Sequence, residues 1–171
     1  MDAKVESNVE ISIRNTGKVH IGRNTSINGP NTRLMSIYDG IIIGHYVSIG
    51  PDCFLLDYNH DIRFPSAWRF KKFSGKGEFS DYTSSGPTII GNNVWIGAKT
   101  VILPGTNISD NVIIAAGSVV SGNIEGFGLY GGVPAKKIKP IYVQCELKLR
   151  TFDWDRRPEV VSQELFAMND V

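Results

Sequence analysis

Aliphatic residues recur at every sixth position over a long stretch of this chain, and that period restricts the fold more than any other feature of the sequence. The repeated positions are Ile90, Ile96, Ile102, Ile108, Ile114 and Val120. Most of the residues that follow them are small, and the fifth residue of each unit is of modest size. Helices repeat about every 3.6 residues and strands about every 2, so neither alone produces this spacing. The pattern predicts short strands that are joined by corners and coil into a solenoid.

The same period occurs in an earlier part of the chain, where its phase shifts. Its clear members there are Ile37, Ile43, Ile49 and Leu55. Weaker matches precede them at Val9, Ile21 and Ile27. One phase shift falls between Ile27 and Ile37, and a larger one falls between Leu55 and Ile90. With three units per turn and about 4.8 Å between turns, about five turns would form a prism roughly 24 Å tall.

Residues 57–88 interrupt the repeat completely and are rich in aromatic, charged and turn-forming residues. We interpret this segment as a loop inserted into the solenoid. Long loops in compact domains are more often functional than decorative, and the alternative is a loop that packs on itself or covers a neighbouring subunit. The apolar side chains that could anchor it are Phe64, Trp68, Phe70 and Phe73.

The aliphatic period stops after Pro140, and the rest of the chain has a different character. Residues 141–171 are helix-prone, with a break expected near Pro158 because proline disrupts a helix interior. We expect this tail to fold over the open end of the prism, since terminal coils of a solenoid need a cap. The predicted organisation is a solenoid domain over residues 1–140 and a helical tail over residues 141–171.

Composition argues against several kinds of partner. Eighteen Lys and Arg against seventeen Asp and Glu leave a formal charge of +1, so no global field favours nucleic acid or an acidic membrane. We find neither a signal peptide pattern nor a run of about 18 apolar residues, which predicts no membrane insertion and a cytoplasmic location.

Cys53 and Cys145 lie far apart and outside any CxxC spacing. We therefore expect two small apolar residues rather than a disulfide or a zinc site.

Two strings carry a family resemblance. IGNNVWIGAKTVILPGTNISDNVIIAAGSVV (residues 90–120), followed by YGGVPAKKIKPI (residues 130–141), resembles the hexapeptide acetyltransferases. Within that superfamily the chain is similar to the maltose and galactoside O-acetyltransferases and to the xenobiotic (streptogramin) and polysaccharide O-acetyltransferases, whose layout includes the long loop and the tail FDWDRRPEV. The resemblance implies an all-β fold, a left-handed parallel β-helix, with a homotrimer whose active sites lie between subunits. It also implies acetyl-CoA as the acyl donor and no metal.

His60 is the catalytic candidate, since it lies where the chain leaves a regular coil and enters the inserted loop. In the family that the chain resembles, the histidine at this place is the general base. An imidazole suits that role because it titrates near neutral pH and can accept the proton of an attacking hydroxyl or amine. Asn59, Asp57, Asp61 or a backbone carbonyl could orient the ring, and the sequence does not choose among them.

The resemblance also implies which residues bind the donor. Trp95 occupies an outward position and matches a tryptophan that lines the cofactor groove in relatives, although subunit packing would equally explain it. Ala98 and Ala116 are corner residues whose backbone could meet the pantetheine amides, although a corner requires small residues in any case. Lys136 and Lys139 match basic positions near the nucleotide phosphates, and an ordinary solvated lysine run is the alternative.

Two further positions qualify the resemblance. Relatives often have Thr-Lys-Asp after the SVV string, whereas Ser121, Gly122 and Asn123 stand here. One phosphate-facing cation is therefore missing, which predicts weaker coenzyme A binding or a greater dependence on the 136–139 lysines. Asn31 lies near the place where related sugar acetyltransferases carry a substrate-binding asparagine, across a phase shift.

The leading hypothesis is an acetyl-CoA-dependent O-acetyltransferase that modifies a sugar or saccharide hydroxyl, with a role in surface polysaccharide. A xenobiotic hydroxyl or an amino-sugar nitrogen is an alternative acceptor. A zinc enzyme of the γ-carbonic anhydrase class would need three histidine ligands, and the chain has only His20, His45 and His60, of which the first two are expected at the surface of the coils. A solenoid that serves only as a binding scaffold would need neither His60 nor the GGVPAKK string.

Overall fold

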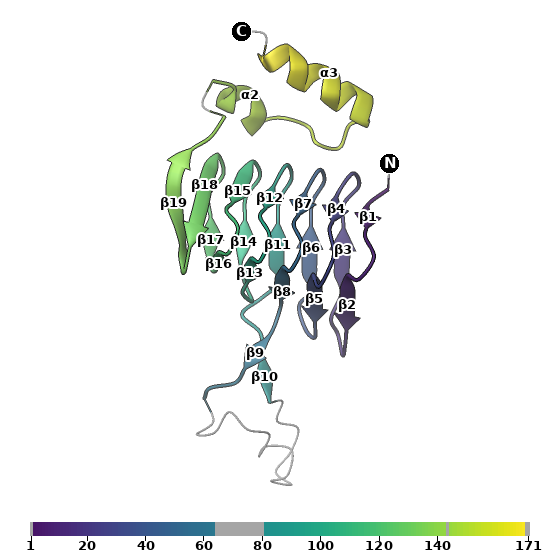
Figure 1. Cartoon of the computed structure of the whole chain (residues 1–171), viewed down its shortest axis with the longest axis vertical. Helices are drawn as coiled ribbons and strands as arrows, with labels where there is room; N and C mark the ends of the chain where they lie inside the picture. Colours follow the sequence, from purple (N-terminus) through teal and green to yellow (C-terminus); the bar gives the residue numbers. More distant parts are fainter. Residues whose placement is uncertain (1, 64–80, 143, 170–171) are drawn as a thin grey trace.

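The computed structural model describes residues 2–63, 81–142 and 144–169. Within them, the chain forms a coil of short parallel strands, with a hairpin projecting from one edge and two helices lying along another (Figure 1). The four aromatic residues that we expected to anchor the inserted loop, Phe64, Trp68, Phe70 and Phe73, lie outside the described residues.

Three parallel sheets form the sides of the coil, and the chain visits them in turn. The first sheet contains β1 (Lys4–Val5), β4 (Ser26–Ile27), β7 (Ser48–Ile49), β12 (Trp95–Ile96), β15 (Val112–Ile114) and β18 (Gly128–Gly132), which pairs antiparallel with β19 (Ala135–Pro140). The second contains β2 (Glu10–Ile13), β5 (Arg33–Ser36), β8 (Phe54–Leu56), β13 (Val101–Ile102) and β16 (Val119–Val120). The third contains β3 (Val19–Ile21), β6 (Ile41–Ile43), β11 (Thr88–Ile90), β14 (Asn107–Ile108) and β17 (Asn123–Ile124). The predicted solenoid of short strands is confirmed.

The core consists of the aliphatic side chains that the six-residue period singled out. All six members of the later stretch, from Ile90 to Val120, are at most 1% exposed. The modest fifth positions also point inward, and Thr100, Thr106 and Ser118 are fully buried. Each of these hydroxyls donates to the carbonyl of the residue three positions earlier, at 2.6 to 2.7 Å. These three buried hydroxyls are therefore satisfied by the backbone of the corners.

Corners between the sheets depend on a residue with a left-handed backbone. Where the chain passes from the first sheet to the second, successive coils place Asn31, Asp52, Lys99 and Gly117 at this position, with φ between 58° and 71°. The backbones of successive coils approach closely here, because a Cβ on Gly97 would lie 2.5 Å from the nitrogen of Ala116. The small residues of the sequence pattern thus follow from how tightly the corners stack.

The first phase shift has a local cause. Leu34 and Ile43 point into the core from β5 and β6, and the corner between these strands runs from Ser36, the last residue of β5, to Gly40 (the 36–40 corner). Ile37 is buried in that corner and not in a strand, so its assignment to the repeat was wrong.

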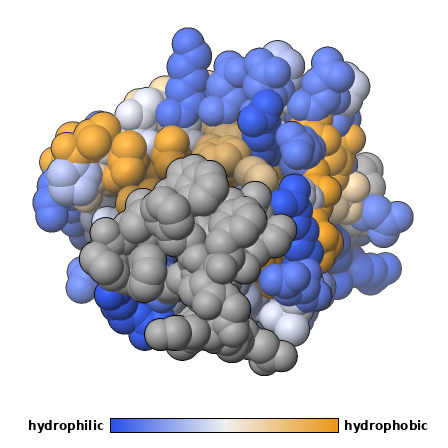
Figure 2. Space-filling view, turned by 90° about the horizontal axis from the view of Figure 1, so that it is seen from below, coloured by the Kyte–Doolittle hydropathy of each residue, from blue (hydrophilic) through white to orange (hydrophobic). Residues whose placement is uncertain are grey.

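The second phase shift is the inserted loop. The chain leaves the coil after β8 and returns at β11, at the corner between the second and third sheets. Its described ends pair as an antiparallel hairpin of β9 (Asn59–His60) and β10 (Tyr82–Thr83) that points away from the coil (Figure 1). Apolar surface reaches solvent on both sides of this projection (Figure 2).

The tail contains α2 (Glu146–Arg150) and α3 (Pro158–Asn169), so the expected break near Pro158 is confirmed. The tail runs along the corner between the third and first sheets and not over the open end, which corrects our expectation (Figure 1). Two aromatic corner residues explain this path. Phe127 shares a buried cluster with Leu149, and the ring of Tyr46 lies 5.8 Å from that of Trp154.

Candidate active site

His60 lies on the hairpin, on the outside of the molecule. It is exposed, and its backbone pairs with Tyr82 across β9 and β10. Its ring centroid is 5.1 Å from that of Tyr82, whose ring in turn makes an edge contact with Tyr58 at 5.2 Å. Burial raises the pKa of the Tyr58 phenol, so this neighbour stays neutral at ordinary pH. The imidazole is therefore held beside aromatic rings and is accessible to an acceptor from outside the molecule, as a general base must be.

Asp57 fixes the base of the hairpin. Its carboxylate is fully buried and accepts four hydrogen bonds from the 36–40 corner of the preceding coil. The donors are the Ser36 hydroxyl (2.7 Å) and the backbone N–H groups of Ile37 (2.8 Å), Tyr38 (3.1 Å) and Gly40 (2.7 Å). The return strand is tied to the same residue, because the Ser84 hydroxyl donates to the Asp57 carbonyl at 2.7 Å.

The structure narrows the choice of groups that could orient the imidazole. The Asp57 carboxylate is occupied by the corner and so does not fill that role. The side-chain oxygen of Asn59 accepts the backbone N–H of His60 at 2.9 Å, and Asp61 accepts from the Arg63 guanidinium at 2.9 Å. Among the described residues, Tyr82 contacts the imidazole ring itself. The sequence did not point to Tyr82, because it follows His60 by more than twenty positions.

The five residues predicted to bind the donor lie together on another side of the coil. Trp95 is 56% exposed on the outer face of β12, where it lies between Ser48 and Ile113 of the adjacent strands. Ala98 and Ala116 occupy the corner between the first and second sheets, one coil apart. Lys136 and Lys139 are exposed on β19, next to β18 of the first sheet.

The candidate base and the candidate donor residues are therefore separated within one chain. The hairpin leaves from the corner between the second and third sheets, whereas the donor residues lie on the first sheet and at its corner with the second. The whole second sheet lies between these two corners. Asn31 also lies at the first–second corner, where its amide donates to Asp52 at 2.9 Å, so one chain does not bring it to His60.

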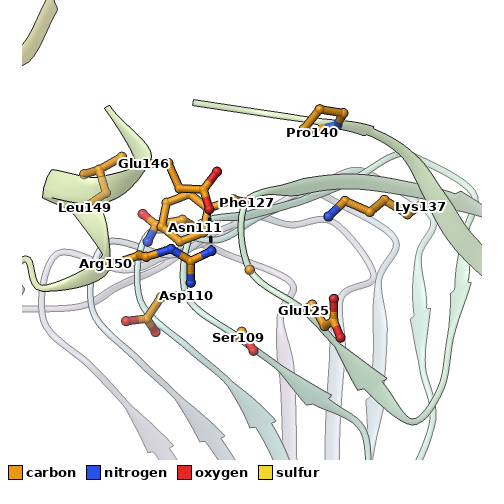
Figure 3. Close-up of a pocket in the computed structure, with 11 residues that line it drawn as sticks. Ser109, Asp110, Asn111, Glu125, Phe127, Lys137, Pro140, Glu146, Leu149 and Arg150 are labelled. Carbon is orange, nitrogen blue, oxygen red and sulfur yellow. Dashed lines mark hydrogen bonds and ion pairs between the residues drawn. The ribbon is translucent and has the colours of Figure 1, made fainter. Parts of the chain in front are cut away.

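A polar cavity of about 450 Å³ lies between α2 and the last coils (Figure 3). Its lining residues are Ser109, Asp110, Asn111, Glu125, Gly126, Phe127, Lys137, Pro140, Glu146, Leu149 and Arg150. Arg150 bonds Glu146 and lies 5.0 Å from the centre of the Phe127 ring, and Asp110 accepts the backbone N–H of Asn92. Lys137 reaches this cavity and therefore differs from the two lysines that we assigned to the donor.

The other histidines have separate surroundings. His20 is exposed on the outer face of β3. His45 accepts the Arg23 backbone N–H on Nδ1 and places Nε2 at 3.3 Å from Asp155, which anchors the tail. The part of the chain that the structure describes contains no group of three or more His, Cys, Asp or Glu residues arranged to bind a metal. None of its helices is both long enough and apolar enough to span a membrane.

The two cysteines have the surroundings expected of small apolar residues. Cys53 is fully buried in the core, where burial raises the pKa of its thiol. Cys145 packs against the cluster beneath the tail.

Comparison with known proteins shows the family to which the chain is related. Residues 87–122 match the family model described as bacterial transferase hexapeptide (six repeats). The chain is 34% identical over 129 residues to a probable macrolide acetyltransferase of Lysinibacillus sphaericus, covering 69% of this chain and 72% of that protein. It is 30% identical over 148 residues to a putative lipopolysaccharide biosynthesis O-acetyl transferase of Escherichia coli, covering 74% of each.

A solved structure is also similar. The crystal structure of a hexapeptide-repeat-containing acetyltransferase from Vibrio cholerae, complexed with acetyl coenzyme A, matches with a TM-score of 0.61 and 26% identity. The match covers 81% of this chain and 68% of that one. The chain spans only 56% to 61% of the length of three chloramphenicol acetyltransferases that it also matches.

Proposed function

Because the chain belongs to the hexapeptide acetyltransferase family, we propose that it transfers the acetyl group of acetyl-CoA to a hydroxyl of a sugar or saccharide. The observation that carries the proposal is the position of His60, a solvent-open imidazole on a hairpin whose base is fixed by a buried carboxylate. The similarity to a putative lipopolysaccharide O-acetyl transferase favours a saccharide acceptor and a role in surface polysaccharide. We place the reaction in the cytoplasm as part of this proposal.

In this mechanism His60 is the general base. It accepts the proton of the acceptor hydroxyl as that oxygen attacks the thioester carbonyl. The C–S bond then breaks, and the imidazolium returns its proton to the leaving sulfur, so coenzyme A departs as the thiol. Binding both substrates in one site supplies much of the rate enhancement, since it removes the entropic cost of their encounter.

The separation of the two groups of residues supports a site between subunits. We propose a homotrimer of left-handed coils in which the hairpin of one chain meets the first sheet of the next. The outer face of the second sheet suits a subunit contact, because Phe54, Val101 and Val119 form an apolar row across adjacent strands. A closed ring of three identical contacts would place the base and the donor residues together three times.

The donor would lie along the first sheet. The exposed indole of Trp95 offers an apolar surface to the pantetheine arm, and the corner backbone at Ala98 and Ala116 offers amide groups. Lys136 and Lys139 would meet the phosphates as point charges. Because Gly122 stands where relatives often have lysine, these two cations carry more of the phosphate contact in our proposal.

One experiment tests the base and the subunit arrangement together. His60→Ala should abolish acetyl transfer while acetyl-CoA binding by calorimetry is retained, and His20→Ala is the control on an exposed histidine outside the hairpin. His60→Ala is then refolded in equal amounts with a Lys136→Ala/Lys139→Ala variant and assayed at an acetyl-CoA concentration well below the raised KM of the lysine variant, where that variant alone turns over slowly. In random trimers with sites between chains, about one quarter of the sites combine two intact halves and recover activity. Full activity of His60→Ala alone would refute the catalytic role, and no recovery in mixed trimers would refute the shared site.

An antibiotic hydroxyl is the second candidate acceptor. The similarity to a probable macrolide acetyltransferase favours this acceptor. The match covers 72% of that protein but only 56% of a chloramphenicol acetyltransferase. The chemistry at His60 would be the same. An acceptor screen with wild-type protein decides between the two.

A further inference from the structure

We propose that the acceptor binds through a single sugar ring in the cavity between the 36–40 corner and the return strand β10; this inference rests on the proposed function. The cavity measures about 290 Å³ and is lined by Tyr38, Asp39, Tyr82, Thr83 and Ser84. It therefore combines two phenol rings, a carboxylate and two aliphatic hydroxyls from segments that are more than forty residues apart in the sequence.

The two walls of this cavity are fixed to each other. Asp57 holds the corner that carries Tyr38 and Asp39, through the backbone N–H groups described above. The same residue holds the other wall, because its carbonyl accepts the Ser84 hydroxyl. The Tyr38 hydroxyl also donates to the Tyr82 carbonyl at 3.4 Å and joins the walls directly. A cavity built in this way is formed before the acceptor arrives, so little binding energy is lost in ordering it.

The cavity is next to the proposed base. Tyr82 lines it and also has its ring 5.1 Å from the ring of His60. A sugar held against Tyr82 would therefore lie beside the imidazole, with a hydroxyl available for deprotonation. Proximity of this kind is what general-base catalysis requires.

The lining has the chemistry of a carbohydrate site. A pyranose has apolar C–H faces that pack on aromatic rings and hydroxyls that donate to a carboxylate. Asp39 is exposed at the rim and can accept such donors, and charge-assisted hydrogen bonds are the strong ones. The volume of about 290 Å³ lies just below the range of small-molecule sites, which is about 300–1,000 Å³, so it suits one sugar ring.

Steady-state kinetics of the full chain test the proposal. The probes are methyl α-D-glucopyranoside and methyl β-D-galactopyranoside, with chloramphenicol and erythromycin as competing acceptors, and released coenzyme A is measured with a thiol reagent. We expect a methyl glycoside to be acetylated. Asp39→Ala should raise its KM about tenfold or more, because a hydrogen bond to a charged group is lost. Asp39→Asn should recover part of this change, and the KM for acetyl-CoA should stay constant. Glu159→Ala, which removes an exposed carboxylate from the tail, is the matched control.

The outcomes separate this inference from the proposed function. If a glycoside is acetylated and Asp39→Ala leaves its KM unchanged, the cavity is not the acceptor site although the function stands. If only chloramphenicol or erythromycin is acetylated, the saccharide acceptor of the proposed function is overturned in favour of an antibiotic hydroxyl, and the single-ring sugar site fails with it. If acetyl-CoA binds but no probe releases coenzyme A in the wild-type protein, the proposed function itself fails, and the acceptor site with it.

Discussion

Replacing Asp57 by asparagine should destabilise the protein through one specific conflict. One carboxylate oxygen accepts from Ser36, Tyr38 and Gly40, and the other accepts the backbone N–H of Ile37. An asparagine that keeps its oxygen at the first position turns its NH2 group toward Ile37, so two donors face each other. The structure offers no orientation of the amide that satisfies all four donors.

The magnitude follows from those bonds. Losing one hydrogen bond to a charged group costs about 1.5–3 kcal/mol, and the other three weaken because the acceptor becomes neutral. The desolvation cost of burying a neutral amide is lower than that of burying a carboxylate, and this difference offsets part of the lost hydrogen-bond energy. Since three of the donors are backbone N–H groups that stay in place, we expect the loss to prevail and the net destabilisation to be about 2 kcal/mol.

Urea unfolding at a fixed protein concentration measures this change, because subunit association makes stability depend on concentration. Asp52→Asn is the matched control, since Asp52 is exposed and accepts only the Asn31 amide among the bonds described. Asp57→Asn should also lower kcat, because Asp57 positions the hairpin that carries His60. The KM for acetyl-CoA should stay unchanged. A stability within about 0.5 kcal/mol of wild type would show that the carboxylate is not the anchor that we infer.

Two further predictions concern the other sides of the coil. Replacing Lys136 and Lys139 together by alanine should raise the KM and the calorimetric Kd for acetyl-CoA while the saturated rate changes little, and a fall in the saturated rate alone would contradict the phosphate assignment. Val101→Asp places a charge in the apolar row of the second sheet and should dissociate the assembly in sedimentation experiments. His20→Asp on the third sheet is its control. An unchanged oligomer in Val101→Asp would exclude the second sheet from the subunit contact.

The fold could be predicted from the sequence because the six-residue period of aliphatic residues follows directly from how the core is packed. Every sixth side chain meets the same interior, so aliphatic residues are required there and little else fits. The exception at Ile37 is instructive. It keeps the spacing by coincidence, because its own corner holds extra residues around the buried carboxylate of Asp57. A period alone does not distinguish a strand from a buried corner.

The surroundings of His60 could be predicted only in part. Its position at the exit from the coil was evident, but the group beside its ring, Tyr82, lies across the inserted loop, and antiparallel pairing of two short segments leaves no periodic signal. The tail was placed wrongly for a related reason. Its path depends on Tyr46 and Phe127, two aromatic residues at corners that carry asparagine in other coils. Such isolated substitutions within a repeat become informative only when their side of the coil is known.

The core of this fold restricts where its chemistry can occur. Inward positions hold aliphatic side chains and small hydroxyls, packed without exposure and already hydrogen-bonded to the corners. A reaction site therefore has to lie on an outer surface, at an interruption of the coil such as the hairpin of His60. Water must nevertheless be excluded if electrostatic interactions are to stabilise a developing charge. A single chain does not bring the donor residues to the acceptor cavity, so we expect the neighbouring chain to complete the site with the donor residues that this chain holds on a different side.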